Sequence, residues 1–395
     1  MLRFSTSGES HGKALVTIIE GLPAGLEIHP EDINRQLQRR QKGYGRGGRM
    51  AIEADEVEIL AGVRAGLTTG SPVAFSIKNR DWENWQEVMA VEDFRRSGER
   101  EVKRPRPGHA DLAGAMKYNH ADMRNVLERA SARETASRVA AGAFFRSFLK
   151  CFNIYIYSQV ISIGAVRAVP VPVSLDGREL FEARIEVSPV RCHDIDKEAE
   201  MIDLIDHARR EGESLGGSFE VGALGVPPGL GTYTTWDSRL DARLSRAIMS
   251  IPAIKAMEIG EGINAAQTPG SRVHDEIHYQ ENRGVFRTTN RAGGVEGGMS
   301  NGETIWLRAY MKPIPTLYKP LVSVNTDRWV EQKADVERSD ICAVPAAAVV
   351  GEAMLAYTIT EVFLEKFNGD FMEEIQDHWG RYCDYIRKEW KWEKI

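Results

Sequence analysis

The chain has 395 residues, of which 42% are hydrophobic and 8% aromatic, and this composition excludes a disordered or fibrous protein. A formal charge of −6 and a pI near 5.9 argue against general binding to nucleic acid, so positive charge must act in local patches. The four cysteines form no Cys-x-x-Cys pair, which favours free thiols in a reducing compartment over a disulfide scaffold.

The N-terminal segment has neither the apolar core of a signal peptide nor the Arg-rich character of a transit peptide. No window approaches the ~18 apolar residues that a membrane span requires. We therefore expect a soluble cytoplasmic protein without a membrane partner.

Taken in chain order, short β-rich runs alternate with a few long amphipathic helices. Runs of β-branched residues predict strands at 14–20, 56–63, 73–78, 154–163, 220–226 and 304–310. Apolar residues at helical spacing predict helices at 132–152, 198–210, 238–250 and 346–367. The break near residues 367–370 predicts one large domain at 1–368 and a C-terminal helical extension at 369–395, which packs on the core or between subunits.

Residues 39–49 are the most informative stretch, because five cations and four glycines stand together without an acid. The cations are Arg39, Arg40, Lys42, Arg46 and Arg49. Clustered like charge and glycine both disfavour folding, whereas guanidinium groups and open backbone N–H groups bind phosphates and carboxylates. The stretch therefore predicts an anion site, and a solvated loop is the alternative.

Two of the nine histidines lie in loops bounded by glycine or proline. His11 stands between Ser10 and Gly12 directly before an apolar strand, and His109 follows the rigid cationic run 104–108. Histidine is the side chain that changes charge near neutral pH, so either residue could exchange a proton with a bound ligand. The alternative for each is an ordinary hydrogen-bonded histidine.

A capping box of Ser131 and Glu134 predicts a helix start just after Arg129 and Ala130. The free N–H groups and the dipole at a helix N-terminus attract anions. These residues are therefore candidates for phosphate binding, and simple helix capping is the alternative.

Two further segments are candidates for ligand contact. Residues 312–316 end a strand with two prolines, so they form a stiff loop that could present Lys312 and Thr316 to a ligand. The alternative is a simple strand terminator. Arg338 and Asp340 precede an apolar run, and they could form either a structural salt bridge or an acid–base pair.

Three familiar motifs match the sequence but fail in context. Residues 8–12 fit the hydrolase nucleophile elbow, yet an apolar strand follows them instead of a helix. Residues 43–48 match Gly-x-Gly-x-x-Gly without the strand before and the helix after that a dinucleotide fingerprint needs. Residues 274–278 lack the His-Glu-x-x-His order of a zinc site. We therefore predict no serine nucleophile, no Rossmann site and no metal site.

Several of these segments together resemble the chorismate synthase family across nearly the whole chain. The signatures, in the family's order, are Gly-Glu-Ser-His-Gly at 8–12, Glu-Arg-Ala-Ser-Ala-Arg-Glu-Thr at 128–135 and Arg-Ser-Asp at 338–340. The Arg-Pro-Gly-His-Ala-Asp segment at 106–111 and the two Gly-Gly pairs at 293–298 are similar too. Three separated signatures in one order argue strongly against a chance match.

The resemblance implies an anti-1,4-elimination, in which phosphate and a ring hydrogen leave 5-enolpyruvylshikimate-3-phosphate to give chorismate. This is the last common step of the shikimate pathway of aromatic amino-acid biosynthesis, and it makes the expected enzyme a lyase. Reduced FMN is required without net redox change. The family fold is a β-α-β sandwich of the α+β class, assembled as a homotetramer.

The resemblance also implies roles for single residues. His11 would be the general acid toward the departing phosphate, His109 would hold a proton near the flavin's pyrimidine edge, and Asp340 would act beside the flavin N5 in removing the ring hydrogen. FMN would be contacted by Arg129, Ala130, Ser131, Pro252, Ala253, Gly297, Lys312, Pro313, Ile314, Pro315, Thr316 and Arg338.

The resemblance leaves two possible ligands for the Arg/Gly stretch at residues 39–49. By resemblance Arg40 and Arg46, with Arg49 in the same loop, would bind NADPH, the possible reductant, or the anionic groups of the substrate. A flavin or NADPH oxidoreductase is one rival function, and it would consume NADPH in stoichiometric amounts. A nucleic-acid-binding module is the other, but the acidic chain lacks repeated aromatic–Arg motifs, so we expect no nucleic-acid partner.

Overall fold

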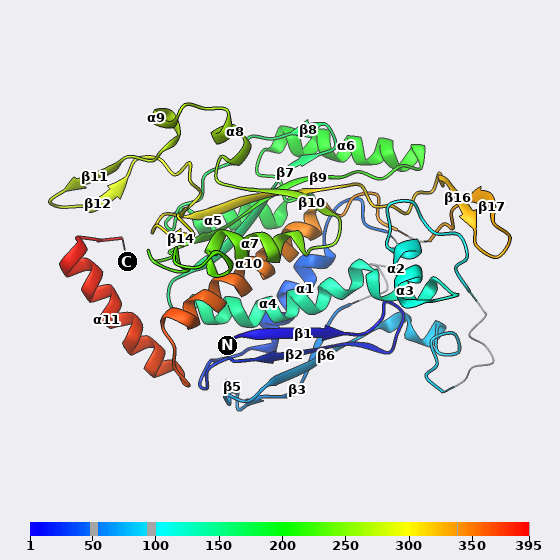
Figure 1. The fold of residues 1–395 in the computed structure, drawn as a ribbon, viewed down its shortest axis with the longest axis horizontal. Coiled ribbons are helices and arrows are strands. Elements are labelled where there is room, and N and C mark those ends of the chain that lie inside the picture. Colours follow the sequence, from blue (N-terminus) through cyan, green and yellow to red (C-terminus); the bar gives the residue numbers. More distant parts are fainter. Residues whose placement is uncertain (48–53, 93–99, 338, 395) are drawn as a thin grey trace.

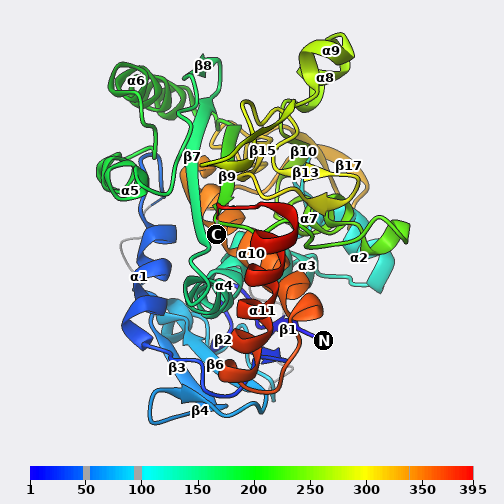
Figure 2. The same ribbon diagram turned by 90° about the vertical axis from the view of Figure 1, so that its left-hand side faces the viewer.

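Two antiparallel sheets enclose a layer of long helices (Figure 1, Figure 2). The computed structural model describes residues 1–47, 54–92, 100–337 and 339–394. The order of layers, sheet on helices on sheet, confirms the expected β-α-β sandwich.

The first sheet has the strand order β1, β2, β6, β3, with every neighbouring pair antiparallel. These strands are β1 (Arg3–Ser7), β2 (Ala14–Glu20), β3 (Val57–Ala61) and β6 (Val73–Lys78). Alternate residues such as Leu15, Ile19 and Phe75 are buried, so one face packs under the helices. A small hairpin of β4 (Val63–Arg64) and β5 (Leu67–Thr68) lies between β3 and β6 in sequence. The three strands predicted in this part of the chain are confirmed.

The second sheet has the strand order β10, β15, β9, β7, β8, and it is antiparallel too. Its strands are β7 (Tyr155–Ile163), β8 (Val166–Arg167), β9 (Gly217–Leu224), β10 (Ile254–Ile259) and β15 (Ile305–Met311). Beyond the sheet lie α5 (Arg178–Val187) and α6 (Ile195–Glu211), and Phe181 of α5 packs with Tyr155 and Tyr157 of β7. The strands predicted at 154–163, 220–226 and 304–310 are confirmed.

The helix layer joins the two sheets. It consists of α1 (Pro30–Gln41), α4 (Thr135–Lys150), α7 (Leu240–Met249) and α10 (Val344–Lys366). α4 contacts β2 of the first sheet, α10 contacts β7 and β9 of the second, and the two helices contact each other. A Cβ at Gly142 would lie 2.4 Å from the Cβ of Ala353, so the close approach of α4 and α10 requires glycine there.

The central helix α10 corrects one expectation from the sequence. Its 23 residues are long and apolar enough to cross a membrane, so the chain does contain such a window. However, 89% of that window is buried inside the protein, and Glu352 in the middle of the helix pairs with arginines. α10 is hydrophobic on all sides because α4 covers it from one side and the second sheet from the other.

Short elements gather at the two ends of the molecule (Figure 1). At one end lie η2 (Arg80–Asn84), α2 (Asp111–Tyr118), α3 (Arg124–Ala130), η3 (Ala132–Glu134), β16 (Val322–Asn325) and β17 (Val330–Lys333). Toward the other end lie η4 (Trp236–Ser238), α8 (Gly262–Ala266), α9 (Gly270–Val273), β11 (Ile277–Gln280), β12 (Gly284–Arg287), β13 (Val295–Glu296), β14 (Met299–Ser300) and α11 (Met372–Trp390).

The C-terminal helix α11 packs on the end of α10. The ring of Trp379 lies 5.5 Å from that of Phe363 and 5.3 Å from that of Phe367, measured between centroids. Trp392, beyond the helix, is buried and forms a bridge with Gly284. The segment 369–395 thus contains the expected helix, while the division of the chain into two domains at 368 stays a prediction.

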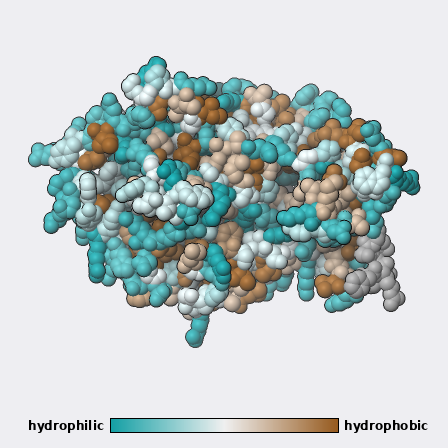
Figure 3. All heavy atoms as spheres, viewed as in Figure 1, coloured by the Kyte–Doolittle hydropathy of each residue, from teal (hydrophilic) through white to brown (hydrophobic). Residues whose placement is uncertain are grey.

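Hydrophilic and hydrophobic side chains are mixed on the face shown in Figure 3, and hydrophobic side chains gather over the end that carries β16 and β17. Leu321, Val322 and Trp329 in this region are 52%, 67% and 72% exposed. Exposed apolar side chains in one place mark candidate contact surfaces.

Candidate active site

A cavity of about 830 Å³ lies where α3 and α4 meet the loops that precede α2, follow β15 and precede α10. Its wall includes all three expected catalytic residues, His11, His109 and Asp340. The other expected residues that line it are Arg40, Arg46, Ala130, Ser131, Pro252, Ala253, Lys312, Ile314, Pro315 and Thr316. Segments that are up to 340 residues apart in sequence, from Ser10 to Val350, therefore converge on one space.

Some expected residues are placed elsewhere. Among the described residues, Arg129, Gly297 and Pro313 do not line this cavity. The guanidinium of Arg129 instead donates hydrogen bonds to the carbonyl oxygens of Thr6 (2.9 Å) and Gly8 (3.1 Å). Gly297 lies in the turn between β13 and β14. Two more, Arg49 and Arg338, lie outside the residues that the structure describes. A contact of these five residues with FMN or NADPH stays a prediction.

The expected cap at Ser131 is confirmed, but the segment that it starts is the short turn η3, and the α-helix begins only at Thr135. Arg129 and Ala130 end α3, and Ser131 caps the next short turn, η3, by accepting a hydrogen bond from the backbone N–H of Arg133 (3.3 Å). Glu134 pairs with Arg138 (3.0 Å) rather than completing a capping box with Ser131. No glycine or proline separates α3 from α4 in the sequence, so the break between the two helices has no composition signal.

His11 is held by the buried carboxylate of Glu128. Its Nδ1 lies 2.8 Å from Oε1 of Glu128, and its backbone N–H donates to Oε2 (2.7 Å). The imidazole stacks on the indole of Trp85, with centroids 3.9 Å apart and an interplanar angle of 20°. Burial alone would raise the pKa of Glu128, but the hydrogen bonds and charge of His11, with the charge of Arg124, outweigh it and the pKa is lowered. The carboxylate is therefore ionised at neutral pH.

His109 has a carboxylate partner of its own. Its Nδ1 lies 2.5 Å from Oδ1 of Asp111, and Arg106 donates to both oxygens of the same carboxylate (2.8 and 3.0 Å). Burial opposes ionisation of Asp111, but the bonds from His109 and Arg106 outweigh it and hold the pKa of that carboxyl well below its usual range. Arg106 also donates to Oγ1 of Thr316 (2.9 Å), so it ties together two walls of the cavity.

Asp340 is held by the Arg/Gly stretch. Nη1 of Arg46 lies 2.9 Å from Oδ2 of Asp340, and the backbone N–H of Gly47 donates to Oδ1 (2.7 Å). The backbone N–H of Ile341 donates to the carbonyl of Gly45 (2.8 Å), whose φ of 86° favours glycine. The loop therefore brings a cation and an amide to the expected acid–base residue, and the ion pair comes from a segment almost 300 residues away.

Arg40 forms a second cationic part of the wall with Arg133, for which the sequence predicted no role. Asp55, which is 2% exposed, lies 3.5 Å from Nη1 of Arg40 and 2.6 Å from Nη1 of Arg133. Burial is the main cause that lowers the pKa of Arg40 to about 10, and the charge of Arg133 adds to it. Two arginines share one carboxylate, so this wall has an excess positive charge that suits an anionic ligand.

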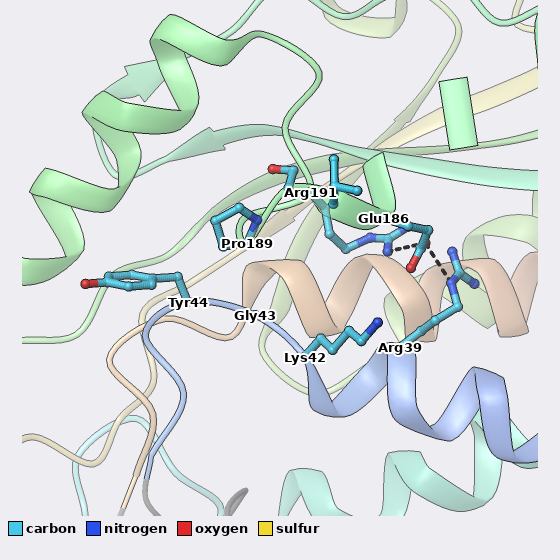
Figure 4. A pocket seen from close by; sticks show the side chains of 9 residues that line it. Arg39, Lys42, Gly43, Tyr44, Glu186, Pro189 and Arg191 are labelled. Atoms are coloured by element: carbon cyan, nitrogen blue, oxygen red, sulfur yellow. Dashed lines mark hydrogen bonds and ion pairs between the residues drawn. The ribbon is translucent and has the colours of Figure 1, made fainter. Parts of the chain in front are cut away.

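Arg39, at the start of the same stretch, points away from this cavity. It lines a smaller cavity of about 370 Å³, together with Lys42, Gly43 and Tyr44 of the same stretch (Figure 4). There it donates to Glu352 (2.6 Å) and Glu186 (2.8 Å), and Glu186 also accepts from Arg191 (2.7 Å). The described cations of the stretch thus divide into two groups. Arg39 and Lys42 line the smaller cavity, where Arg39 joins a buried ion-pair network, and Arg40 and Arg46 line the large cavity.

Two of the carboxylates that bind the histidines, Asp111 and Glu128, stand inside the family motifs, but no role was predicted for them. A local signal existed for Asp111, which follows His109 by two residues and Arg106 by five. Glu128 is 117 residues from His11, and no spacing in the sequence connects them. Likewise, no pattern in the sequence predicts that Trp85 contacts His11, because only the folded loops bring them together.

A comparison with protein families supports the expectation raised by the motifs. The family model described as chorismate synthase matches residues 2–364 of the chain. The chain belongs to the chorismate synthase family. It is 62% identical to the chorismate synthase of Syntrophomonas wolfei over 395 residues, covering 100% of both chains. It is 56% identical to the chorismate synthase of Desulforudis audaxviator over 387 residues, covering 98% of both.

A solved structure supports the fold as well. A structure titled "Crystal Structure of Chorismate Synthase" matches with a TM-score of 0.77 and 43% sequence identity, covering 98% of each chain. The chain is therefore a carbon–oxygen lyase of aromatic biosynthesis with the chorismate synthase fold.

Proposed function

We propose that the large cavity is where the family reaction takes place in this chain. In that reaction phosphate and a ring hydrogen leave 5-enolpyruvylshikimate-3-phosphate in an anti-1,4-elimination that yields chorismate. The observation that carries the proposal is the convergence of His11, His109 and Asp340 on one cavity of about 830 Å³. The arginines of the same wall suit the phosphate and the two carboxylates of the substrate.

The lining also fits reduced FMN. The volume of about 830 Å³ lies within the range of cofactor and ligand sites. Apolar residues such as Ile251, Ala346 and Val350 suit the flat ring system, while Lys312 and Thr316 offer polar contacts. We propose that these groups, together with Ala130, Ser131, Pro252, Ala253, Ile314 and Pro315, hold the cofactor. When bound, reduced FMN supplies the transient electron density that the elimination needs.

The protein's own groups then do acid–base and electrostatic work. His11 gives a proton to the departing phosphate, and Arg40 and Arg46 stabilise the negative charge that develops on its oxygens. His109 would hold a proton near the pyrimidine edge of the flavin. Asp340, oriented by Arg46, takes part in removing the ring hydrogen. Each acid–base contribution is worth roughly 10² to 10⁴ in rate.

We assign Arg40 and Arg46 to the substrate's anionic groups rather than to NADPH. Arg40 is 5% exposed and its guanidinium is fixed by Thr135 (2.9 Å), so it is reached only from inside the cavity. NADPH remains the proposed source of electrons for the flavin, either directly or through a separate reductase.

We also propose a cytoplasmic homotetramer. All four cysteines are free, which suits a reducing compartment. The exposed apolar residues Leu321, Val322 and Trp329 offer a surface for assembly.

An anaerobic assay tests this function. The purified chain is mixed with 5-enolpyruvylshikimate-3-phosphate and chemically reduced FMN, and chorismate and phosphate are measured. We expect the two products in equal amounts, many turnovers per flavin, and no product without FMN. Replacing the chemical reductant by NADPH shows whether the chain reduces its own flavin. Stoichiometric oxidation of NADPH without chorismate would instead support an oxidoreductase.

A further inference from the structure

We propose that Glu128 is a positioning residue that holds His11 as the doubly protonated imidazolium, with its Nε2 proton ready for the departing phosphate. The inference rests on the general-acid role proposed above for His11. It names the residue that holds His11, the protonation state of its imidazole, and the ring nitrogen that gives up the proton.

Glu128 binds both the imidazole ring and the backbone N–H of His11. Oε1 lies 2.8 Å and Oε2 3.1 Å from Nδ1, and Oε2 also accepts the backbone N–H of His11 (2.7 Å). The backbone carbonyl of Glu128 accepts the N–H of Ser10 (3.0 Å). One residue of α3 therefore fixes both the loop and the ring. With Nδ1 bound to the carboxylate, proton transfer to a ligand falls to Nε2.

The imidazole ring of His11 is held across its face by Trp85 as well as at its edge by Glu128. Trp85 stacks on His11 at 3.9 Å, and its Nε1–H donates to Asp81 (3.2 Å). The guanidinium of Arg100 lies 4.3 Å from the centre of the indole ring, so its charge and that of Asp81 offset each other beside Trp85. Turning the imidazole out of this plane would break the stacking on Trp85, and flipping it within the plane would break the contact with Glu128.

The charges around buried Glu128 also favour a protonated His11, although the outermost carboxylate, Glu337, has a side chain that is 29% exposed. Glu128 is 1% exposed at its side chain, and it lies 3.4 Å from Arg124, which lies 2.9 Å from Glu337. Two carboxylates and one guanidinium carry a net charge of −1, and protonated His11 makes the cluster neutral. An uncompensated charge in such a buried place is costly, so the ion pair with imidazolium is favoured.

In the proposed step, one proton passes from His11 to the departing phosphate. The Nε2–H bond of His11 breaks and a new O–H bond forms on the phosphate oxygen. The bond between that oxygen and the substrate carbon breaks, and its electron pair leaves with the phosphate. The Nδ1 proton stays on the ring, bonded to Glu128, and His11 ends as the neutral imidazole.

The central test combines Glu128→Gln with His11→Ala. In Glu128→Gln the amide can present an N–H to Nδ1, which leaves a neutral ring whose Nε2–H is a very weak acid. We expect kcat for chorismate formation to fall about 10² to 10³-fold, with the KM for substrate within about threefold. In the His11→Ala background the same substitution should lower kcat by less than about threefold, because Glu128 acts through His11.

Two further variants complete the experiment. Glu128→Asp keeps the charge and should recover at least tenfold of the activity lost in Glu128→Gln. Glu220→Gln is a matched control, since Glu220 is a buried carboxylate of β9, bonded to Gln159 and Arg308, that does not line the cavity. Its kcat should be unchanged, and thermal unfolding of every variant shows that the fold is retained.

The outcomes separate the two proposals. Unchanged kcat in His11→Ala would contradict the general-acid role itself. If His11→Ala is impaired but Glu128→Gln is not, or if Glu128→Gln costs as much with His11 absent as with it present, the role of Glu128 is overturned. Should Glu128→Gln fail to fold, Glu128→Asp carries the test. It must then show a fall in kcat with His11 present and no further fall with His11 absent.

Discussion

Two histidines that line the cavity each contact a buried carboxylate, and the two pairs look alike but are built differently. His11 and Glu128 are 117 residues apart, and the carboxylate lies mainly against the histidine, with one longer contact of 3.4 Å to Arg124. His109 and Asp111 are two residues apart, and Asp111 is shared with the backbone N–H and guanidinium of Arg106. The first pair exists only because of the tertiary fold, whereas the second is a local loop structure.

This difference separates two uses of a buried carboxylate. Asp111 accepts three hydrogen bonds from Arg106 in addition to its contact with His109, so its loss affects the loop as well as the ring. Glu128 also binds the His11 loop, but through a single backbone N–H, and its one contact with an arginine is the longer one of 3.4 Å to Arg124. Substitutions should therefore act mainly on catalysis at the first pair and on both catalysis and stability at the second.

The largest expected effect comes from His11→Ala. We expect kcat to fall about 10³-fold, since the departing phosphate loses its proton donor, while the cavity walls stay in place. Chorismate formation measures the activity, and circular dichroism with thermal unfolding checks the fold. A variant that keeps more than a tenth of the activity would show that the first pair has no acid–base role.

Asp111→Asn tests the second pair. Removing the charge leaves Arg106 without its buried partner, and we expect unfolding to become easier by about 3 kcal/mol. Glu128→Gln should cost at most about half as much, because fewer partners depend on that carboxylate. Urea unfolding of the two variants in parallel gives the comparison. Equal losses of stability would remove the proposed distinction between the pairs.

Glu352, a third buried carboxylate, lies outside both pairs and tests the pH dependence. Burial opposes its ionisation, but the surrounding arginines outweigh it and lower the pKa from 4.5 to about 2. Because the folded pKa is the lower one, the stabilisation is present above about pH 4.5 and is lost as the pH falls toward 2. The loss is roughly 3 kcal/mol. Urea unfolding between pH 6 and 3 should be less pH-dependent in Glu352→Gln than in the parent chain, and equal slopes would contradict this.

Arg46→Ala should have the smallest effect of the four. Asp340 loses its ion pair at 2.9 Å but keeps the hydrogen bond from the backbone N–H of Gly47 (2.7 Å). We expect the KM for substrate to rise about tenfold, equivalent to about 1.4 kcal/mol, with a smaller change in kcat. Steady-state kinetics measure both values. An unaltered KM would count against substrate contact by the Arg/Gly stretch.

Much of the fold could be predicted because strands and helices leave local patterns of apolar residues in the sequence. The strands at 14–20 and 73–78 have the predicted bounds, and α10 begins two residues before its predicted start. The separate helix α3 could not be predicted, since no proline or glycine lies between it and α4 to mark where it ends. The apolar window of α10 shows the same limit, because a pattern does not say whether lipid or protein surrounds a helix.

By itself the sequence determined the strands and long helices, the cationic glycine-rich stretch, the two loop histidines and the family. Only the tertiary structure decided that Glu128 meets His11, that Arg46 meets Asp340, and that Arg39 turns instead toward Glu352. The physical reason is that periodic burial of apolar side chains encodes which face of an element packs inward. It does not encode which distant loop supplies the partner of a polar group, because that depends on how all the elements pack together.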